Sequence, residues 1–315
     1  MARLFYFPAS MTARFNATGS IESTYKAREV EGFLDLHFYR KIGFQLALLS
    51  SKLGVAPAQV TLCGTALGIA AGHLYYYRDL RVNLLGMALL VLSNALDNAD
   101  GQLARMTNRG SREGRVIDGL GDLAVFVSVY FHLCLRYVTD GGSNWVWLLA
   151  IAAGASSSVQ MAVADYLRNA YMYFGSDRSG GEFDSSAKLE EGYAQLKWRN
   201  QPWRKVLLRV YLDYTVGQER YIPQMMKVRN AVEARPSEPW LSERYRRENK
   251  PIVKCANFFG RNTRMILLFL LLILNQPIWY FILEITILNL LLVFVLVRQK
   301  EVLDRLLDHL GNATA

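Results

Sequence analysis

Cysteine and histidine are scarce in this sequence, with three and four residues respectively in a chain of 315. They share no close spacing, and Cys63 and Cys134 fall inside hydrophobic runs. This scarcity argues against a disulfide framework and against a zinc site built from Cys and His ligands. No DNA- or RNA-binding module is recognisable either, so nucleic acid is not an expected partner.

Apolar residues make up 52% of the chain, while 20% of its residues are charged, so the two kinds must be segregated. Hydrophobic runs recur, mostly near the ~20 residues that a helix needs to cross a bilayer. They occupy residues 58–77, 82–96, 116–138, 145–174, 257–275 and 278–297. The first run begins too far into the chain for a cleavable signal peptide, so we expect it in the mature protein. The pattern predicts an all-α integral membrane protein with six transmembrane helices.

The fifth run reaches adequate length only if it begins near Asn257. Arg261 and Arg264 then lie within its first two turns, which is tolerable where a polar cavity receives them. Pro277 breaks the apolar sequence and predicts a tight turn. The last two transmembrane helices should therefore form a hairpin that is joined on the outer side.

Lys and Arg are unevenly distributed among the connecting segments. Seven lie in residues 1–57, and nineteen accompany eleven acids in residues 168–264. By the positive-inside rule, both termini and the long polar segment are cytoplasmic. The net charge of +9 thus indicates topology and contact with anionic lipids. The expected location is the inner membrane of a prokaryote, with the active site facing the cytoplasm.

The same features divide the chain into five parts. The N-terminal part carries Phe33, Phe38, Ile42 and Leu49 at helical intervals among charges, which predicts an amphipathic helix on the membrane surface. The insertion between helices 4 and 5 should hold two or three short helices, partly at the interface. The parts are a cytoplasmic N-terminal segment at 1–57, transmembrane helices 1–4 at 58–174, a cytoplasmic helical insertion at 175–256, transmembrane helices 5 and 6 at 257–300, and a cytoplasmic tail at 301–315.

Four aspartates follow the second hydrophobic run, in the stretch DNADGQLARMTNRGSREGRVIDGLGD at 97–122. Asp97 and Asp100 are three residues apart and share one helix face, while Asp118 and Asp122 are four apart and share a face of the next helix. Such a cluster would be destabilised by repulsion and desolvation unless cations compensate it.

Carboxylate ligands without nearby His or Cys favour a hard ion, so Mg²⁺ or Mn²⁺ is expected and Ca²⁺ is possible. Four acids suit two ions, which are able to hold a pyrophosphate and stabilise attacking and leaving oxygens at phosphorus. Gly101 and Gly114 allow a ligand close to the backbone, and Ala104 keeps the same face open. Arg105 is placed to pair with a phosphate.

The spacing D-x2-D-G-x2-A-R-x8-G-x3-D-x3-D resembles the signature of the CDP-alcohol phosphotransferase (CDP-alcohol phosphatidyltransferase) family, and this chain matches every fixed position. The resemblance implies a homodimer of six-helix protomers that displaces CMP from a CDP-linked donor with an alcohol acceptor. It implies that Asp97, Asp100 and Asp118 are the main metal ligands. It also implies that Asp122 contacts the second ion and accepts the acceptor's proton. The residues that would line the CMP and pyrophosphate site are Gly101, Ala104, Arg105 and Gly114.

Three arginines, Arg168, Arg261 and Arg264, are expected at the membrane level of the aspartates, where they are candidates for binding an anionic acceptor. This favours CDP-diacylglycerol as donor and a polar alcohol or polyol phosphate as acceptor. The alternative is transfer of a phosphoaminoalcohol or similar head group from a soluble CDP-alcohol to a lipid alcohol. A divalent-cation transporter or channel is the alternative of a different class. Glu284, in the last run, is expected to form an inter-helix or dimer hydrogen bond.

Overall fold

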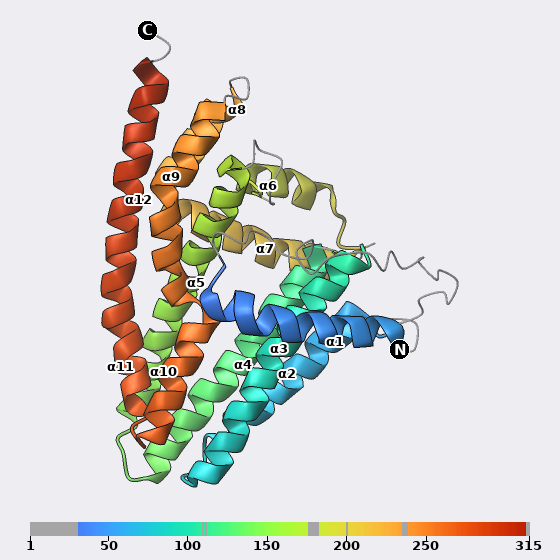
Figure 1. Ribbon diagram of the computed structural model, residues 1–315, viewed down its shortest axis with the longest axis vertical. Coiled ribbons are helices and arrows are strands. Elements are labelled where there is room, and N and C mark those ends of the chain that lie inside the picture. The colour runs from blue at the N-terminus through green and yellow to red at the C-terminus, as the bar shows by residue number, and fades with distance from the viewer. Residues whose placement is uncertain are drawn as a thin grey trace.

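A computed structural model describes residues 31–108, 110, 112–175, 183–199, 201–234 and 239–312. Within these ranges, every regular element is a helix (Figure 1). In chain order they are the π-helix η2 (Asp35–Tyr39), α1 (Arg40–Lys52), α2 (Pro57–Leu74), α3 (Leu80–Met106), α4 (Arg112–Thr139), α5 (Trp145–Gly175), α6 (Ser186–Gln195), α7 (Pro202–Tyr221), α8 (Pro223–Glu233), α9 (Pro239–Ala256), the 3₁₀ helix η3 (Asn257–Phe259), α10 (Arg261–Ile273), α11 (Ile278–Ile285) and α12 (Ile287–Asn312).

Four stretches of the described chain are long and apolar enough to cross a membrane, namely α3, most of α4, α5, and the rod of α11 and α12 from Ile278 to Leu310. Residues 240–259 and 261–273, in α9 to η3 and in α10, add a fifth if the two segments, bent by 41° at the break between them, count as one span. The all-α class is therefore confirmed over the described residues. Of the six predicted spans, four or five are supported, and a crossing by α2 stays a prediction.

One face of α2 is made of glycine. Gly64, Gly68 and Gly72 recur every fourth residue and face α3 and α4. A Cβ added at Gly68 would lie 2.5 Å from Cγ2 of Val125, and one added at Gly72 would lie 2.5 Å from Oγ of Ser128. Small residues at this spacing let helix backbones approach closely, which is a common packing mode in membrane proteins.

The N-terminal helices cross the bundle near the ends of α2 and α3 (Figure 1). α1 packs on α3, and Gly54, with φ of 70°, follows the end of α1. Pro57 then occupies the first turn of α2, where its missing N–H costs nothing. η2 and α1 leave Phe38 and Leu49 exposed. The helix is thus present and amphipathic, and its location on the membrane surface stays a prediction.

The insertion contains four described helices, α6 to α9, where two or three were predicted. α8 and α9 pack against α12, and α9 also packs against α5, so a hydrophobic core continues beyond the apolar spans. α9 then leads through η3 into α10. The predicted tight turn between the last two spans is confirmed, because Asn275, with φ of 57°, and Pro277 separate α10 from α11.

Close packing of α2 makes Gly72 a sensitive position. We expect Gly72→Ala to destabilise the protein by about 1–3 kcal/mol, because the new methyl group would overlap Ser128 and the backbone N of Val129. Thermal unfolding in detergent measures the effect. Gly154→Ala in α5 is the matched control, since its Cβ would meet the Tyr130 ring at an ordinary 3.7 Å. If both variants unfold at the same temperature, the tight packing of α2 is wrong.

Candidate metal and nucleotide site

The aspartates of the predicted motif meet at the end of α3 and the beginning of α4. Asp97, Asp100 and Asp118 each offer a carboxylate oxygen, and these oxygens all lie within 4.8 Å of one another. Asp100 is buried, while Asp97 and Asp118 are partly exposed. An oxygen-only donor set of this kind fits Mg²⁺ or Mn²⁺. The convergence that the spacing predicts is therefore present for these three residues.

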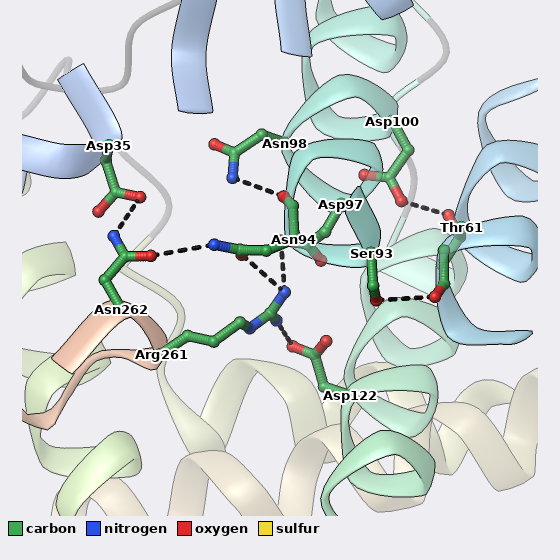
Figure 2. A network of polar contacts seen from close by, with 11 residues as sticks. Asp35, Thr61, Ser93, Asn94, Asp97, Asn98, Asp100, Asp122, Arg261 and Asn262 are labelled. Atoms are coloured by element: carbon green, nitrogen blue, oxygen red, sulfur yellow. Dashed lines mark hydrogen bonds and ion pairs between the residues drawn. The ribbon is translucent and has the colours of Figure 1, made fainter. Parts of the chain in front are cut away.

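α2 forms a third wall of the site, which the sequence reading missed. Thr61 donates a hydrogen bond from Oγ1 to Oδ2 of Asp100 at 2.5 Å (Figure 2). Ser93 donates to the carbonyl oxygen of Gly64 at 2.7 Å and holds α2 against α3 one turn away. The only signal for Thr61 in the sequence is its place one turn after Pro57, at the same end of the bundle as the aspartates.

Arg261, the first residue of α10, supplies positive charge to the cluster. Its guanidinium forms ion pairs with Asp97, at 2.9 Å, and with Asp122 (Figure 2). The three side chains are only 24–30% exposed, so solvent screens these pairs incompletely. The sequence placed Arg261 among acceptor-binding candidates at the level of the aspartates, and the structure brings it into direct contact with two of them.

A chain of amide side chains joins Arg261 to the N-terminal helices. Asn94 accepts a hydrogen bond from Arg261 at 3.2 Å and donates one to Oδ1 of Asn262 at 2.9 Å. Asn262 in turn donates to Asp35 of η2 at 2.8 Å (Figure 2). Burial raises the pKa of the neighbouring Tyr39 hydroxyl, and its interaction with Asn94 opposes this only in part. The sequence analysis did not identify Asn94, Asn262, Asp35 or Tyr39 as site residues.

The residues predicted to hold the nucleotide surround the aspartates. Arg105 is exposed in the last turn of α3, and its guanidinium lies over Gly101, where an added Cβ would stand 3.4 Å from Nη1. Ala104 is partly exposed on the same helix, and Gly114 is exposed in the first turn of α4. Gly101 directly follows Asp100, and Gly114 lies one helical turn before Asp118.

The other two predicted arginines have different surroundings. Arg168 on α5 donates to Oδ1 of Asn257 in η3 at 3.2 Å, and its Nε is buried without a hydrogen-bond partner among the described residues. Arg264 is buried and forms an ion pair with Glu284. Glu284 also accepts from the Tyr130 hydroxyl, so the inter-helix hydrogen bond predicted for this acid is present.

An apolar pocket adjoins the aspartates. It lies between α3, α4, α10 and α11 and has a cavity volume of about 50 Å³. Ser93, Asp122, Val125 and Arg261 line both this pocket and the aspartate site. Its further lining consists of Leu90, Asn94, Phe126, Val129, Tyr130, Arg264, Met265, Leu268 and Tyr280. Asp122 thus stands between a carboxylate cluster and a largely apolar space.

Fold and site together describe a helical protein with helices apolar enough to span a membrane and a carboxylate cluster able to hold a divalent cation. The CDP-alcohol phosphatidyltransferase family model matches residues 54–187, which include all four aspartates. The chain is also similar to a phosphatidylinositol phosphate synthase of Streptomyces avermitilis, with 30% identity over 122 residues, 39% of this chain. The match spans about half, 49%, of that relative's length. Residues 54–187 thus match a CDP-alcohol phosphatidyltransferase domain, as the motif predicts, whereas Arg261 and Arg264 lie outside the matched region.

Charge compensation by Arg261 predicts a stability effect that depends on metal. In EDTA, Arg261→Gln should lower the free energy of unfolding by about 1–3 kcal/mol, because it leaves Asp97 and Asp122 without their cation. Excess Mg²⁺ should reduce this loss, since the ion supplies the missing charge. Thermal unfolding of both proteins, with and without Mg²⁺, measures the difference. Arg78→Gln, which removes an exposed ion pair with Asp140, serves as control. Equal losses from the two variants would contradict the assigned role.

Proposed function

We propose that this protein is a phospholipid-biosynthetic CDP-alcohol phosphotransferase that displaces CMP from a CDP-linked donor with the hydroxyl of an acceptor alcohol. The observation that carries the proposal is the carboxylate cluster of Asp97, Asp100 and Asp118, which lies inside the region matched by the family. The favoured donor is CDP-diacylglycerol, and the favoured acceptor is a polar alcohol or polyol phosphate. The similar protein's name denotes formation of phosphatidylinositol phosphate, which supports a phosphatidyl donor.

In the proposed reaction, Asp97, Asp100, Asp118 and Asp122 hold two divalent ions, Mg²⁺ or Mn²⁺. When bound, these ions neutralise the pyrophosphate and stabilise charge on the attacking and leaving oxygens. Arg105 holds a phosphate of the donor, while Gly101, Ala104 and Gly114 leave room for the CMP portion.

Asp122 acts as the general base. It takes the proton of the acceptor hydroxyl as the new oxygen–phosphorus bond forms, and CMP leaves with the electrons of the broken bond. Because Asp122 is paired with Arg261 and faces the apolar pocket, the proposal requires its carboxylate to become accessible to the acceptor. Arg261, released from this pair, is then available to an anionic acceptor, with Arg168 and Arg264 as further candidates.

The apolar pocket favours a second candidate within the same reaction class. A space lined by Val125, Phe126 and Leu268 beside Asp122 suits a lipid alcohol, whose head group would be supplied by a soluble CDP-alcohol. A divalent-cation transporter or channel is less well supported, because the aspartates lie within a family match to nucleotide-dependent transferases. We place the aspartate end of the bundle on the cytoplasmic side, where soluble CDP-linked compounds are made.

CMP release distinguishes these candidates. Purified protein in nanodiscs with Mg²⁺ is incubated with CDP-diacylglycerol and a panel of polyols and polyol phosphates, or with CDP-choline or CDP-ethanolamine and diacylglycerol. We expect CMP release with CDP-diacylglycerol and its loss in EDTA and in Asp118→Asn. Asp140→Asn, at the other end of the bundle, should retain activity. CMP release only from the soluble CDP-alcohols would favour the second candidate. The absence of metal-dependent CMP release from every donor would refute the proposed enzymatic function.

Substitutions of Arg105 and Asp122 should affect different steps of the reaction, namely donor binding and the chemical step. Arg105→Ala should chiefly weaken donor binding, by about 1.5–3 kcal/mol, the range for a hydrogen bond to a charged group. Asp122→Asn should keep donor binding but lower turnover by about 10²–10⁴, because it removes the base. Donor affinity and turnover are measured for each variant. Near-normal turnover in Asp122→Asn would show that this aspartate has another role.

A further inference from the structure

α7 has three distinct faces, and the first is packed against the protein. Leu212, Thr215 and Gln218 are buried on this face. Gln218 donates hydrogen bonds to the carbonyl oxygen of Ala162 at 3.1 Å and to Asp165 at 3.2 Å, both on α5. These contacts fix the rotation of α7 about its own axis, and so they determine what the other two faces meet.

The second face is apolar and largely exposed in the described part of the chain. Its residues recur at intervals of three, four, four and seven, which places them in one stripe along the helix. They are Trp203, Val206, Val210, Tyr214 and Tyr221, with exposed fractions of 72%, 39%, 45%, 41% and 38%. We call these five residues the α7 stripe. A continuous stripe of this kind marks an interaction surface, whereas isolated apolar side chains do not.

The third face is polar and carries Arg209, Asp213 and Arg220, all exposed. Arg209 and Asp213 form an ion pair at 3.1 Å, one turn apart. Over the whole helix, four basic residues accompany two acidic ones, so α7 carries a net charge of +2. They are Arg204, Lys205, Arg209 and Arg220 against Asp213 and Glu219. On the polar face itself, two arginines accompany one aspartate, so the face that borders the apolar stripe has a net charge of +1.

The position of α7 in the fold indicates what covers the stripe. α7 lies across the long helices, near the end of the bundle that α1 also crosses (Figure 1). It packs against α4 and α5, which are both candidate membrane spans. The boundary of the hydrocarbon layer must fall near this end, because the apolar part of α4 begins there, at Val116. α7 therefore lies across the candidate spans at this level.

We propose that α7 is a membrane-surface helix whose stripe enters the lipid bilayer, with its basic residues beside anionic lipid head groups. Its composition fits this occupant, because Trp and Tyr are enriched at the membrane interface and basic residues flanking an apolar face attract anionic lipids. Trp198, just before the helix, is 56% exposed and lies under Lys205 Nζ at 5.6 Å, which extends the same composition.

A hydrogen bond connects the α7 stripe to the last third of α5. Tyr214 belongs to the stripe, and its hydroxyl donates to Asp165 on α5 at 3.3 Å. Asp165 lies one turn before Arg168, which contacts η3 next to Arg261. In the proposed arrangement, α7 lies on the bilayer surface and contacts α5, which in turn contacts η3 just before α10 and the aspartate site.

Depth-dependent fluorescence quenching tests this proposal in the whole protein. The three native cysteines are replaced, and single cysteines are introduced as Val206→Cys and Val210→Cys on the stripe, Asp213→Cys on the polar face, and Asp308→Cys near the end of α12. All four positions are exposed, so the changes should not disturb folding. Each variant carries an environment-sensitive fluorophore and is placed in nanodiscs whose lipids bear a nitroxide near the head group.

We expect quenching by the lipid nitroxide to be several-fold greater at positions 206 and 210 than at 213 and 308, with the reverse order for iodide in water. At the stripe positions, quenching by the lipid nitroxide should be greater in nanodiscs that contain one third phosphatidylglycerol than in nanodiscs of phosphatidylcholine alone. Iodide access at 206 and 210 equal to that at 308 would overturn the proposal, as would protection from both quenchers, which would indicate a protein partner. Equal quenching in the two lipid mixtures would remove the anionic-lipid part.

Discussion

Four carboxylates gathered beside a membrane require positive charge, and Arg261 provides it in the described structure. Its pairs with Asp97 and Asp122 join the start of α10 to α3 and α4. The break at η3 and Gly260 lets α10 begin at this point, with Arg261 as its first residue. Removal of one member of such a group leaves charge uncompensated where solvent is limited, which is why the geometry of the site depends on this contact.

A second ion pair, Arg264 with Glu284, lies three residues further along α10 and is fully enclosed. Gln160 accepts from Arg264 at 2.7 Å, and Tyr130 donates to Glu284, so α4, α5, α10 and α11 meet in one satisfied network. The first pair faces the carboxylate cluster, and the second borders the apolar pocket. One turn of α10 therefore separates a polar chemical site from a space suited to apolar groups.

The sequence predicted the features that spacing or special residues encode. Asp97, Asp100 and Asp118 converge because helical periodicity and a short return fix their relative positions, and Pro277 marks the predicted turn between α10 and α11. Thr61, Asn94 and Asp35 could not be predicted as site residues, since single polar residues carry no periodic signal and their partners lie far away in sequence. Pairing of Arg264 with Glu284 joins residues 20 apart on different helices, which only the packing determines. α2 was predicted as apolar, and its glycine face became meaningful only once α3 and α4 lay against it.

The central claim is that the aspartates of α3 and α4 hold divalent ions against the phosphates of a CDP-linked donor. Mn²⁺ electron–nuclear double resonance measures this most directly, in Asp122→Asn protein so that the donor is turned over slowly. The account predicts ³¹P hyperfine coupling between bound Mn²⁺ and the CDP-linked donor, and loss of both coupling and tight Mn²⁺ binding when Asp118→Asn is added. Tight Mn²⁺ binding without ³¹P coupling at saturating donor, or coupling that survives Asp118→Asn, would contradict it.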